Sequence, residues 1–314
     1  MKTLILHHSA DMDGILSGVI AKYYCRHTAN PGDHIITAGA DYGDNLDKTY
    51  QGWSLDQFDK IYVIDFSDDW LFTNEAIRNK IIWIDHHINA IEKNYNVAKY
   101  VLDGVAACRL TQQFFANVNY AFLTEYDYIE RKVNEPLLVA LIGEHDIWDE
   151  SSVFARKLNF GITNIKFEAI EFLHEETRHV IAGKKNDEKN LHQSERLVRI
   201  CDVGEGVINY IQRTSSILGG GIPINIFGHK GIAFNTHIRS SLIHRLKDDE
   251  EFMMVWNDTG KPLMKLSFYS EEKVEALKFA KYFGGGGHKR ACGCQVDFNT
   301  LTLILKNHYA NIKP

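Results

Sequence analysis

The sequence predicts an α/β protein whose N-terminal part is a largely parallel sheet with helices on both faces. Uninterrupted apolar runs, which are typical of parallel strands buried on both sides, recur over 3–8, 34–40, 60–66 and 80–87. After the first run, Ile15, Val19, Ile20 and Tyr23 follow helical spacing, which predicts a helix over 14–27. Strands that alternate with a helix in this way indicate an open, doubly covered sheet.

The pattern changes after about residue 104, where helical stretches begin to dominate, most clearly over 134–148 and 167–183. A polar stretch over 184–218 reads as a helical connector that ends before "GGGIP". Beyond it, a smaller mixed α/β domain is predicted by strand-like runs over 224–235, 251–258 and 262–270 and by an amphipathic helix over 271–283. We therefore predict three parts, which span 1–183, 184–218 and 219–314.

Composition limits the classes of partner. With 314 residues and a formal net charge of −6, the chain lacks the surplus of Lys and Arg that a grip on long duplex nucleic acid needs. No run approaches the roughly 20 apolar residues of a membrane span, so we expect no membrane partner. Five scattered cysteines without a recognisable secretory leader indicate reduced thiols and a cytoplasmic protein. Cys292 and Cys294 are interpreted as small buried side chains rather than zinc ligands.

Acids and histidines gather at the predicted ends of three strands. His7, Asp11 and Asp13 form an H-x3-D-x-D pattern after the first strand. Asp65 follows the third strand, and Asp85, His86 and His87 follow the fourth. Because ligands of open α/β sheets bind outside the carboxyl ends of the strands, these groups are expected to converge. The alternative is a helix N-cap with solvated acids beside a polar strand end.

Carboxylates crowded in this way repel one another unless divalent cations neutralise them. Carboxylate oxygen and imidazole without thiolate favour two divalent ions, with Mn2+ expected first and Mg2+ or Co2+ as alternatives. Two such ions about 3.5–4 Å apart support hydrolysis of a phosphoester by an activated hydroxide.

A glycine-rich stretch, "GGGGHKRACG" over 284–293, is the second chemical signal. Consecutive glycines allow positive φ and let backbone amides approach an anion, and His288, Lys289 and Arg290 add positive charge beside them. We interpret the stretch as a ligand-binding loop, with an ordinary glycine-rich turn as the alternative.

Five motifs in order, "HHSADMDG", "VIDFS", "IDHH", "GEHD" and "GGGGHKRACG", resemble the DHH/DHHA1 phosphoesterases over nearly the whole chain. The resemblance implies a catalytic DHH domain, a substrate-binding DHHA1 domain and two metals. It implies that one metal is bound by His7, Asp11 and Asp65 and the other by Asp13, Asp65, His86 and Asp146. Asp146 could instead be a polar helix end.

The resemblance further implies that His87 contacts the scissile phosphate or assists proton transfer and that Asp85 orients the histidines. It also implies that the substrate is recognised by Gly285, Gly286, Gly287, His288 and Arg290. One departure stands out, because Tyr269 occupies a position where family members often carry a phosphate-binding arginine. Arg109 and Arg239 are the candidates to replace it, with an ion-paired role as the alternative.

The predicted activity is metal-dependent hydrolysis of short RNA or DNA oligonucleotides or dinucleotides to 5′-mononucleotides, in a cleft between the two domains. Alternatives with the same chemistry are a pAp phosphatase and a cyclic dinucleotide phosphodiesterase, and a pyrophosphatase or exopolyphosphatase is a third. A nucleotide-sensing protein on the same fold is the alternative from outside enzymes. A homodimer is left open.

Overall fold

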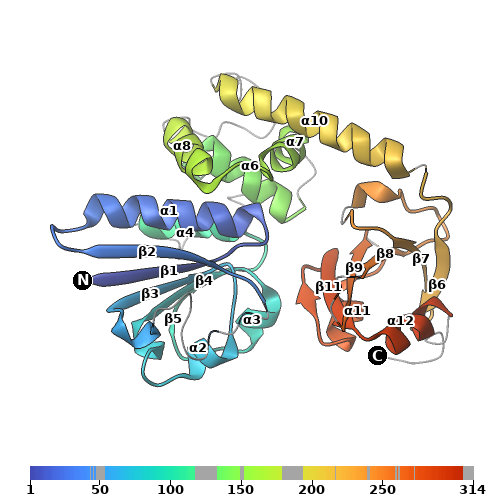
Figure 1. Cartoon of the computed structure of the whole chain (residues 1–314), viewed down its shortest axis with the longest axis horizontal. Helices are drawn as coiled ribbons and strands as arrows, with labels where there is room; N and C mark the ends of the chain where they lie inside the picture. The colour runs from blue at the N-terminus through green and yellow to red at the C-terminus, as the bar shows by residue number, and fades with distance from the viewer. Residues whose placement is uncertain are drawn as a thin grey trace. The chain divides into compact units, whose positions relative to one another are not determined.

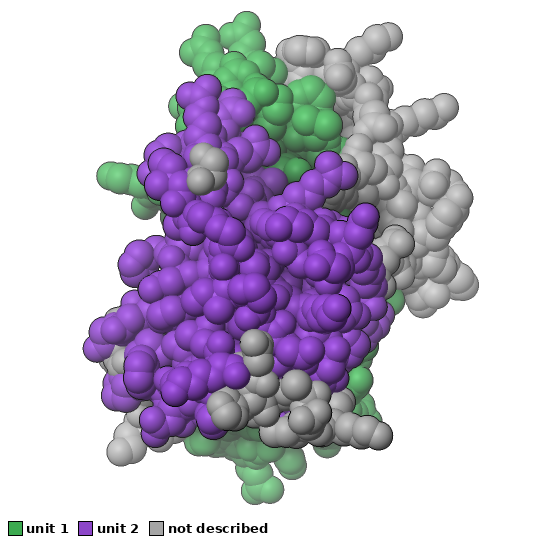
Figure 2. All heavy atoms as spheres, turned by 90° about the vertical axis from the view of Figure 1, so that its right-hand side faces the viewer, with its two compact units in different colours: residues 1–205 green, residues 206–314 purple. Residues whose placement is uncertain are grey.

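A computed structural model describes residues 1–42, 44, 46, 54–116, 133–148, 152–178, 194–215, 217–238, 241–258, 260, 262–271 and 273–306, with only the backbone described at 89 and 90. The chain divides into two compact units, Met1–Glu205 and Gly206–Pro314 (Figure 2). The boundary between the units falls inside helix α10, Glu195–Ser215, which lies within the predicted connector. The bound predicted at residue 183 lies outside the described residues.

The first unit is built on a parallel sheet. Its strands are β1 (Lys2–His8), β2 (His34–Ala40), β3 (Lys60–Ile64), β4 (Ile81–Asp85) and β5 (Ala98–Val101). They pair in the order β2-β1-β3-β4-β5, and every pair is parallel. The predicted parallel sheet is confirmed, and β5 is an addition at the edge that the sequence did not reveal. Its "AKYV" is short, and only Tyr100 is buried, so the run lacks the apolar signal of its neighbours.

Helices cover both faces of this sheet (Figure 1). Ile5 and Ile84 pack against Ala21 of α1 (Met12–Thr28) and Leu110 of α4 (Ala107–Phe115). On the other face, Leu6 belongs to a core shared with α2 (Asp69–Thr73). Because side chains alternate along a strand, residues of β1 with odd numbers face α1 and those with even numbers face away from it. By this alternation, the side chains of the neighbouring His7 and His8 leave β1 in opposite directions.

A further group of helices packs over α1. It consists of α6 (Leu137–Asp146), α7 (Val153–Ile162), α8 (Phe167–Thr177) and the first half of α10, and it shares one apolar core with α1. Helices α7 and α10 approach closely at glycines, since a Cβ atom at Gly204 would lie 1.8 Å from the Lys157 carbonyl oxygen. Helix α3 (Ile88–Glu92) and 3-10 turns at Leu55–Gln57 and Arg78–Lys80 complete the described elements of the unit.

The second unit is built on a mixed sheet and also contains the end of α10 from Gly206. Its strands are β6 (Ile222–Ile226), β7 (His229–Asn235), β8 (Phe252–Asn257), β9 (Met264–Ser270), β10 (Gly286–Gly287) and β11 (Ala291–Val296). They pair in the order β10-β11-β9-β8-β7-β6, with β7 and β8 parallel and the other pairs antiparallel. A 3-10 turn at Ser241–Ile243 and helices α11 (Leu277–Tyr282) and α12 (Phe298–Leu305) accompany the sheet. The predicted mixed α/β class is confirmed.

Helix α11 is shorter than the helix predicted over 271–283. Its first helical residue is Leu277, because the chain before it turns so that the Ala276 amide donates to Ser270 Oγ at 3.2 Å. Burial of Val274 and Ala276 fixes this turn. In the part of the chain that the structure describes, we find no helix that is long and apolar enough to cross a bilayer.

Buried His174 on α8 predicts a pH dependence of stability. Its side chain is 1% exposed, its ring lies 5.4 Å from that of Tyr23, and neither ring nitrogen has a hydrogen-bond partner among the described residues. Burial lowers the pKa of His174 to about 4. Between pH 6.5 and 4 the unfolded chain therefore binds a proton that the folded chain does not, so stability falls with decreasing pH, by up to about 3 kcal/mol.

The substitution His174→Phe is expected to remove this contribution. Urea unfolding at pH 7, 6 and 5 should then show a shallower loss of unfolding free energy in the variant than in the wild type. Parallel pH profiles for the two proteins would contradict the prediction.

Candidate metal centre

The predicted acids and imidazoles meet at the carboxyl edge of the parallel sheet. Strand β1 lies between β2 and β3, so the strand order changes direction there: β2 is added on one side of β1, and β3, β4 and β5 are added on the other. Such a switch point leaves a crevice at the strand ends where ligands of open α/β sheets bind. His8 ends β1, Asp65 follows β3, and Asp85 ends β4.

The first group of candidate ligands comes from β1, the start of α1 and the end of β3. His8 Nδ1 lies 2.9 Å from Asp11 Oδ2 and 3.6 Å from Asp65 Oδ2. Ligand atoms of all three residues lie within 4.8 Å of one another. Asp11 is held in place because its Oδ1 accepts the Gly14 amide at 3.0 Å as the N-cap of α1.

The second group is centred on His86, just after β4. His86 Nε2 lies 3.5 Å from Asp13 Oδ2, 3.4 Å from Asp65 Oδ1 and 3.3 Å from Asp146 Oδ2. Asp146 is the last residue of α6. Asp65 therefore belongs to both groups, with one carboxylate oxygen beside His8 and the other beside His86.

The backbone at Asp65 is unusual. Its φ of +63° lies in the left-handed region, which a non-glycine residue adopts at a cost of roughly 1–3 kcal/mol. The Asp65 amide donates to the Ile84 carbonyl at 2.9 Å, which ties the end of β3 to β4. Its side chain is 1% exposed, and Oδ1 accepts no hydrogen bond within the described part of the chain. A buried oxygen in this state fits a bound cation.

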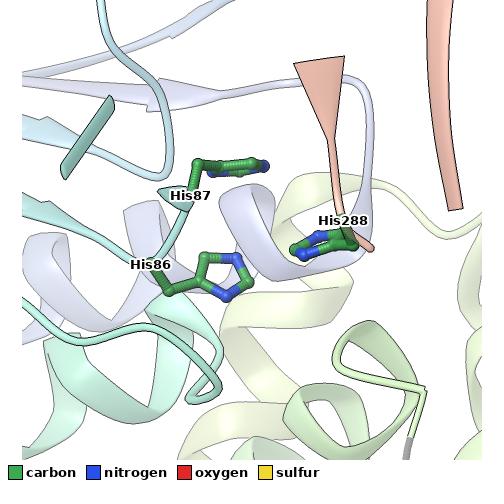
Figure 3. Close-up of side chains that lie close together, drawn as sticks. All are labelled: His86, His87 and His288. Carbon is green, nitrogen blue, oxygen red and sulfur yellow. The ribbon is translucent and has the colours of Figure 1, made fainter. Parts of the chain in front are cut away.

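Asp85 and His87 form a hydrogen-bonded pair beside these groups, and His87 Nδ1 also lies 3.8 Å from Asp65 Oδ1. Asp85 Oδ1 lies 2.8 Å from His87 Nδ1 and also accepts the backbone amides of His86 and His87 at 2.7 and 3.0 Å. Trp83 Nε1 donates to Asp85 Oδ2 at 3.0 Å. Figure 3 shows His86 and His87 on the short segment after β4, and their ring centroids are 4.8 Å apart. Asp85 thus fixes the segment that presents both histidines.

Burial and mutual repulsion dominate the electrostatics. Burial raises the pKa of Asp65 and Asp146 well above the usual range, and neighbouring aspartates raise both further. Burial, and then Asp11, also raise the pKa of Asp13. Contact with His8 outweighs burial at Asp11 and holds its pKa at about 2. Three crowded acids that resist ionisation, together with imidazole nitrogens, make a donor set that fits divalent cations.

The two histidines of the pair in β1 differ in surroundings. His7 lies on the side of β1 that faces α1, and its ring stacks against that of Phe167 at the start of α8, with 6.0 Å between the ring centroids. His7 Nδ1 lies 2.8 Å from the His8 carbonyl oxygen. A Cβ atom at Gly18 would lie 2.4 Å from the His7 ring. Neither group contains His7, and the first contains His8, to which the sequence analysis assigned no role. The ligand role predicted for His7 is untested, and the alternation of β1 is the signal that distinguishes the two residues.

The predicted substrate-binding residues lie in the second unit. Gly286 and Gly287 form β10, and the His288 amide donates to the Ala291 carbonyl at 2.8 Å to close the turn into β11. A Cβ atom at Gly285 would lie 2.1 Å from the Gly293 carbonyl oxygen, so the strand pair requires glycine there. The Arg290 carbonyl accepts the Ser270 amide at 2.9 Å, which ties this loop to β9.

Arg109 and Arg239 were the two candidates to replace a phosphate-binding arginine. Arg109 is fully buried, and its Nε donates to Glu135 Oε1 at 2.9 Å, so the ion-paired alternative is correct and Arg109 does not replace a phosphate-binding arginine. Arg239 lies outside the described residues. Tyr269 pairs with Ala291 across β9 and β11, next to the glycine-rich loop.

Comparison with known proteins places the fold. No family profile matches the chain, and no curated protein matches it in sequence. An exopolyphosphatase-related protein from Bacteroides fragilis is similar in structure, with a TM-score of 0.50 and 12% identity over 98% of this chain and 92% of that one. Also similar are the pGpG-specific phosphodiesterase PggH from Vibrio cholerae (TM-score 0.46, 10% identity, 98% of both chains) and the exonuclease RecJ bound to manganese (0.44, 14%, 100% and 91%). At 12% identity, the likeness to the exopolyphosphatase-related protein shows a shared fold and no more.

Proposed function

We propose that the chain is a metal-dependent phosphodiesterase of the DHH/DHHA1 type, which hydrolyses short oligonucleotides or linear dinucleotides to 5′-mononucleotides. The observation that carries this proposal is the placement of Asp65, whose two oxygens lie beside two different groups of ligands. A carboxylate shared by the two groups would hold two cations close together, as two-metal phosphoester hydrolysis needs. Mn2+ is the proposed metal, with Mg2+ and Co2+ as alternatives.

His8, Asp11 and Asp65 would hold one cation, and Asp13, Asp65, His86 and Asp146 would hold the other. When bound, these cations would supply Lewis acidity that activates water and neutralises charge on the phosphate. Asp65 would fix the distance between the two ligand groups, because the strained turn after β3 and the bond to β4 leave its carboxylate little freedom.

His87 would act on the phosphate. Burial opposes protonation of His87, but in the metal-free chain the Asp85 charge and hydrogen bond raise its pKa to about 9, which favours the protonated imidazole. A protonated imidazole held by a carboxylate can donate a hydrogen bond to a phosphate oxygen or a proton to the leaving oxygen. We assign recognition of the rest of the substrate to the loop that contains Gly285, Gly286, Gly287, His288 and Arg290.

A panel of substrates tests the proposal. The protein is incubated with Mn2+ and, separately, a five-nucleotide RNA, pApA, cyclic di-AMP, pAp or polyphosphate, and initial rates are ranked. We expect the five-nucleotide RNA or pApA to be cut fastest, with release of 5′-mononucleotides. A higher rate with cyclic di-AMP, pAp or polyphosphate would replace the proposed substrate. Binding of nucleotides without cleavage of any panel member would favour a sensor and overturn the enzyme proposal.

The neighbouring histidines of β1 give a second test. The substitution His8→Gln is expected to weaken one of two Mn2+ sites by about 100-fold or more, since it removes a ligand. The matched substitution His7→Gln should keep two Mn2+ sites and lower the unfolding free energy by about 1–3 kcal/mol through lost packing against Phe167. Mn2+ titration followed by electron paramagnetic resonance and urea unfolding measure both effects. Loss of a metal site in the His7 variant alone would reverse the assignment.

A further inference from the structure

Both oxygens of Asp13 accept hydrogen bonds from the first turn of α4. Asp13 Oδ2 accepts the Ala107 amide at 2.8 Å, and Asp13 Oδ1 accepts the Cys108 amide at 2.8 Å. These amides lie 94 and 95 residues along the chain from Asp13. They are the first amides of a nine-residue helix, and such amides have no acceptor within their own helix. A carboxylate at this position also meets the positive end of the helix dipole.

The contacts fix the direction of the Asp13 carboxylate. The oxygen that accepts the Ala107 amide, Oδ2, is also the oxygen 3.5 Å from His86 Nε2. A carboxylate oxygen has two lone pairs, so an amide can occupy one while the other faces a cation. Asp13 is 2% exposed, so water does not compete for these positions.

Helix α4 is itself held firmly. Ala106, Ala107 and Cys108 are fully buried, and Arg109 forms its buried ion pair with Glu135. A Cβ atom at Gly143 of α6 would lie 2.5 Å from Arg109 Cδ, so α4 and α6 approach closely at this glycine. Because α6 ends at Asp146, the same pair of helices places both Asp13 and Asp146 around His86.

We propose that the first turn of α4 is a positioning element for the metal group around His86, with the Ala107 amide as the donor that orients Asp13 Oδ2. This inference rests on the proposed function, since it assumes that this group binds a divalent cation. The element acts on the group of Asp13, Asp65, His86 and Asp146. It makes no hydrogen bond to His8 or Asp11 among the described residues, so its loss affects one metal and spares the other.

Replacement of the Ala107 amide by an ester, through incorporation of lactic acid at position 107, tests the proposal with little steric change. We expect Mn2+ titration to show one site weakened by about 10–100-fold, the effect typical of groups that orient a metal ligand, and the other unchanged. The matched control is an ester at position 153, the exposed first residue of α7, which should leave both sites unchanged. Urea unfolding with EDTA reports separately on stability.

Ala107→Pro is a second variant that needs no ester chemistry. Proline suits the first position of a helix, and Ala106 has φ −53° and ψ 146°, which a residue before proline adopts. The ring occupies the place of the amide hydrogen and displaces Asp13 Oδ2, so a larger loss at the same site is expected, with Val153→Pro as the control.

Three results would overturn the positioning role. They are an unchanged Mn2+ affinity at both sites in the ester and proline variants, equal weakening of both sites, and the same loss in the position 153 controls. Metal binding is measured here without substrate. A wild-type protein that binds two Mn2+ ions but cuts no phosphoester would therefore sink the proposed function and leave this test intact.

Discussion

Asp65→Asn is expected to lower the proposed phosphodiesterase activity by at least about 1,000-fold. One oxygen of Asp65 faces His8 and the other faces His86, so the substitution weakens both cation sites at once. A loss of about 4 kcal/mol of transition-state stabilisation, a fraction of what two cations supply, corresponds to this factor. Asparagine tolerates left-handed backbone, so φ +63° is retained and the effect is one of charge.

The measurement is kcat/KM on the best substrate of the panel at saturating Mn2+, together with the number of Mn2+ ions bound. Asp69→Asn is the matched control, because Asp69 is four residues further along the chain and its exposed side chain pairs with Lys93. The control should keep full activity. An Asp65→Asn protein with more than about a tenth of wild-type kcat/KM would contradict a shared carboxylate.

Asp65→Asn is expected to lower the free energy of unfolding when Mn2+ is bound and to raise it when EDTA removes the metal. At a Mn2+ concentration 100 times the dissociation constant, each of two independent sites adds about 2.7 kcal/mol, so the wild type should gain about 5 kcal/mol over the protein in EDTA. Asp65→Asn should lose most of this gain. In EDTA, however, the variant should be more stable than the wild type by about 1–2 kcal/mol, because ionisation of a carboxylate that is buried among other acids costs free energy and a neutral amide avoids that cost.

The sign of the pH dependence follows from the raised pKa of Asp65. In EDTA the folded chain holds a proton on this group at pH values where the unfolded chain has lost it, so the wild type loses stability as pH rises above about 4. The advantage of the variant should therefore grow from pH 5 to pH 8. Urea unfolding of both proteins at pH 5 and pH 8, with Mn2+ and with EDTA, measures the difference in unfolding free energy under each of these four conditions. Equal unfolding midpoints for the two proteins in EDTA would show that the acids need no cation.

Much of the first unit could be predicted because its strands are long apolar runs. The runs before His8, Asp65 and Asp85 identify parallel strands, and the carboxyl ends of such strands meet at one edge. Strand β5 escaped prediction because its "AKYV" carries a lysine and is mostly exposed. The helix predicted over 271–283 was too long because a buried turn at Val274 and Ala276 outweighs local helical preference.

Motif spacing could not predict that His8, and not His7, lies beside Asp11 and Asp65. This placement depends on which face of β1 the helix α1 covers, and this is a property of the tertiary structure. The amide partners of Asp13 were equally out of reach, because they lie more than 90 residues away and are backbone groups with no side-chain signature. Arg109 shows the same limit, since only its burial against Glu135 distinguishes a structural arginine from a ligand-binding one.

The long reach between Asp13 and α4 has a consequence for the order of events during synthesis. A nascent chain that has left the ribosome only as far as residue 87 contains His8, Asp11, Asp13, Asp65 and His86, yet the amides at 107 and 108 are still to come. Domains tend to fold as units as they emerge, and sites that need distant segments form last. Under the proposed function, an ion near His86 would therefore be bound in its final geometry only after α4 has emerged and folded.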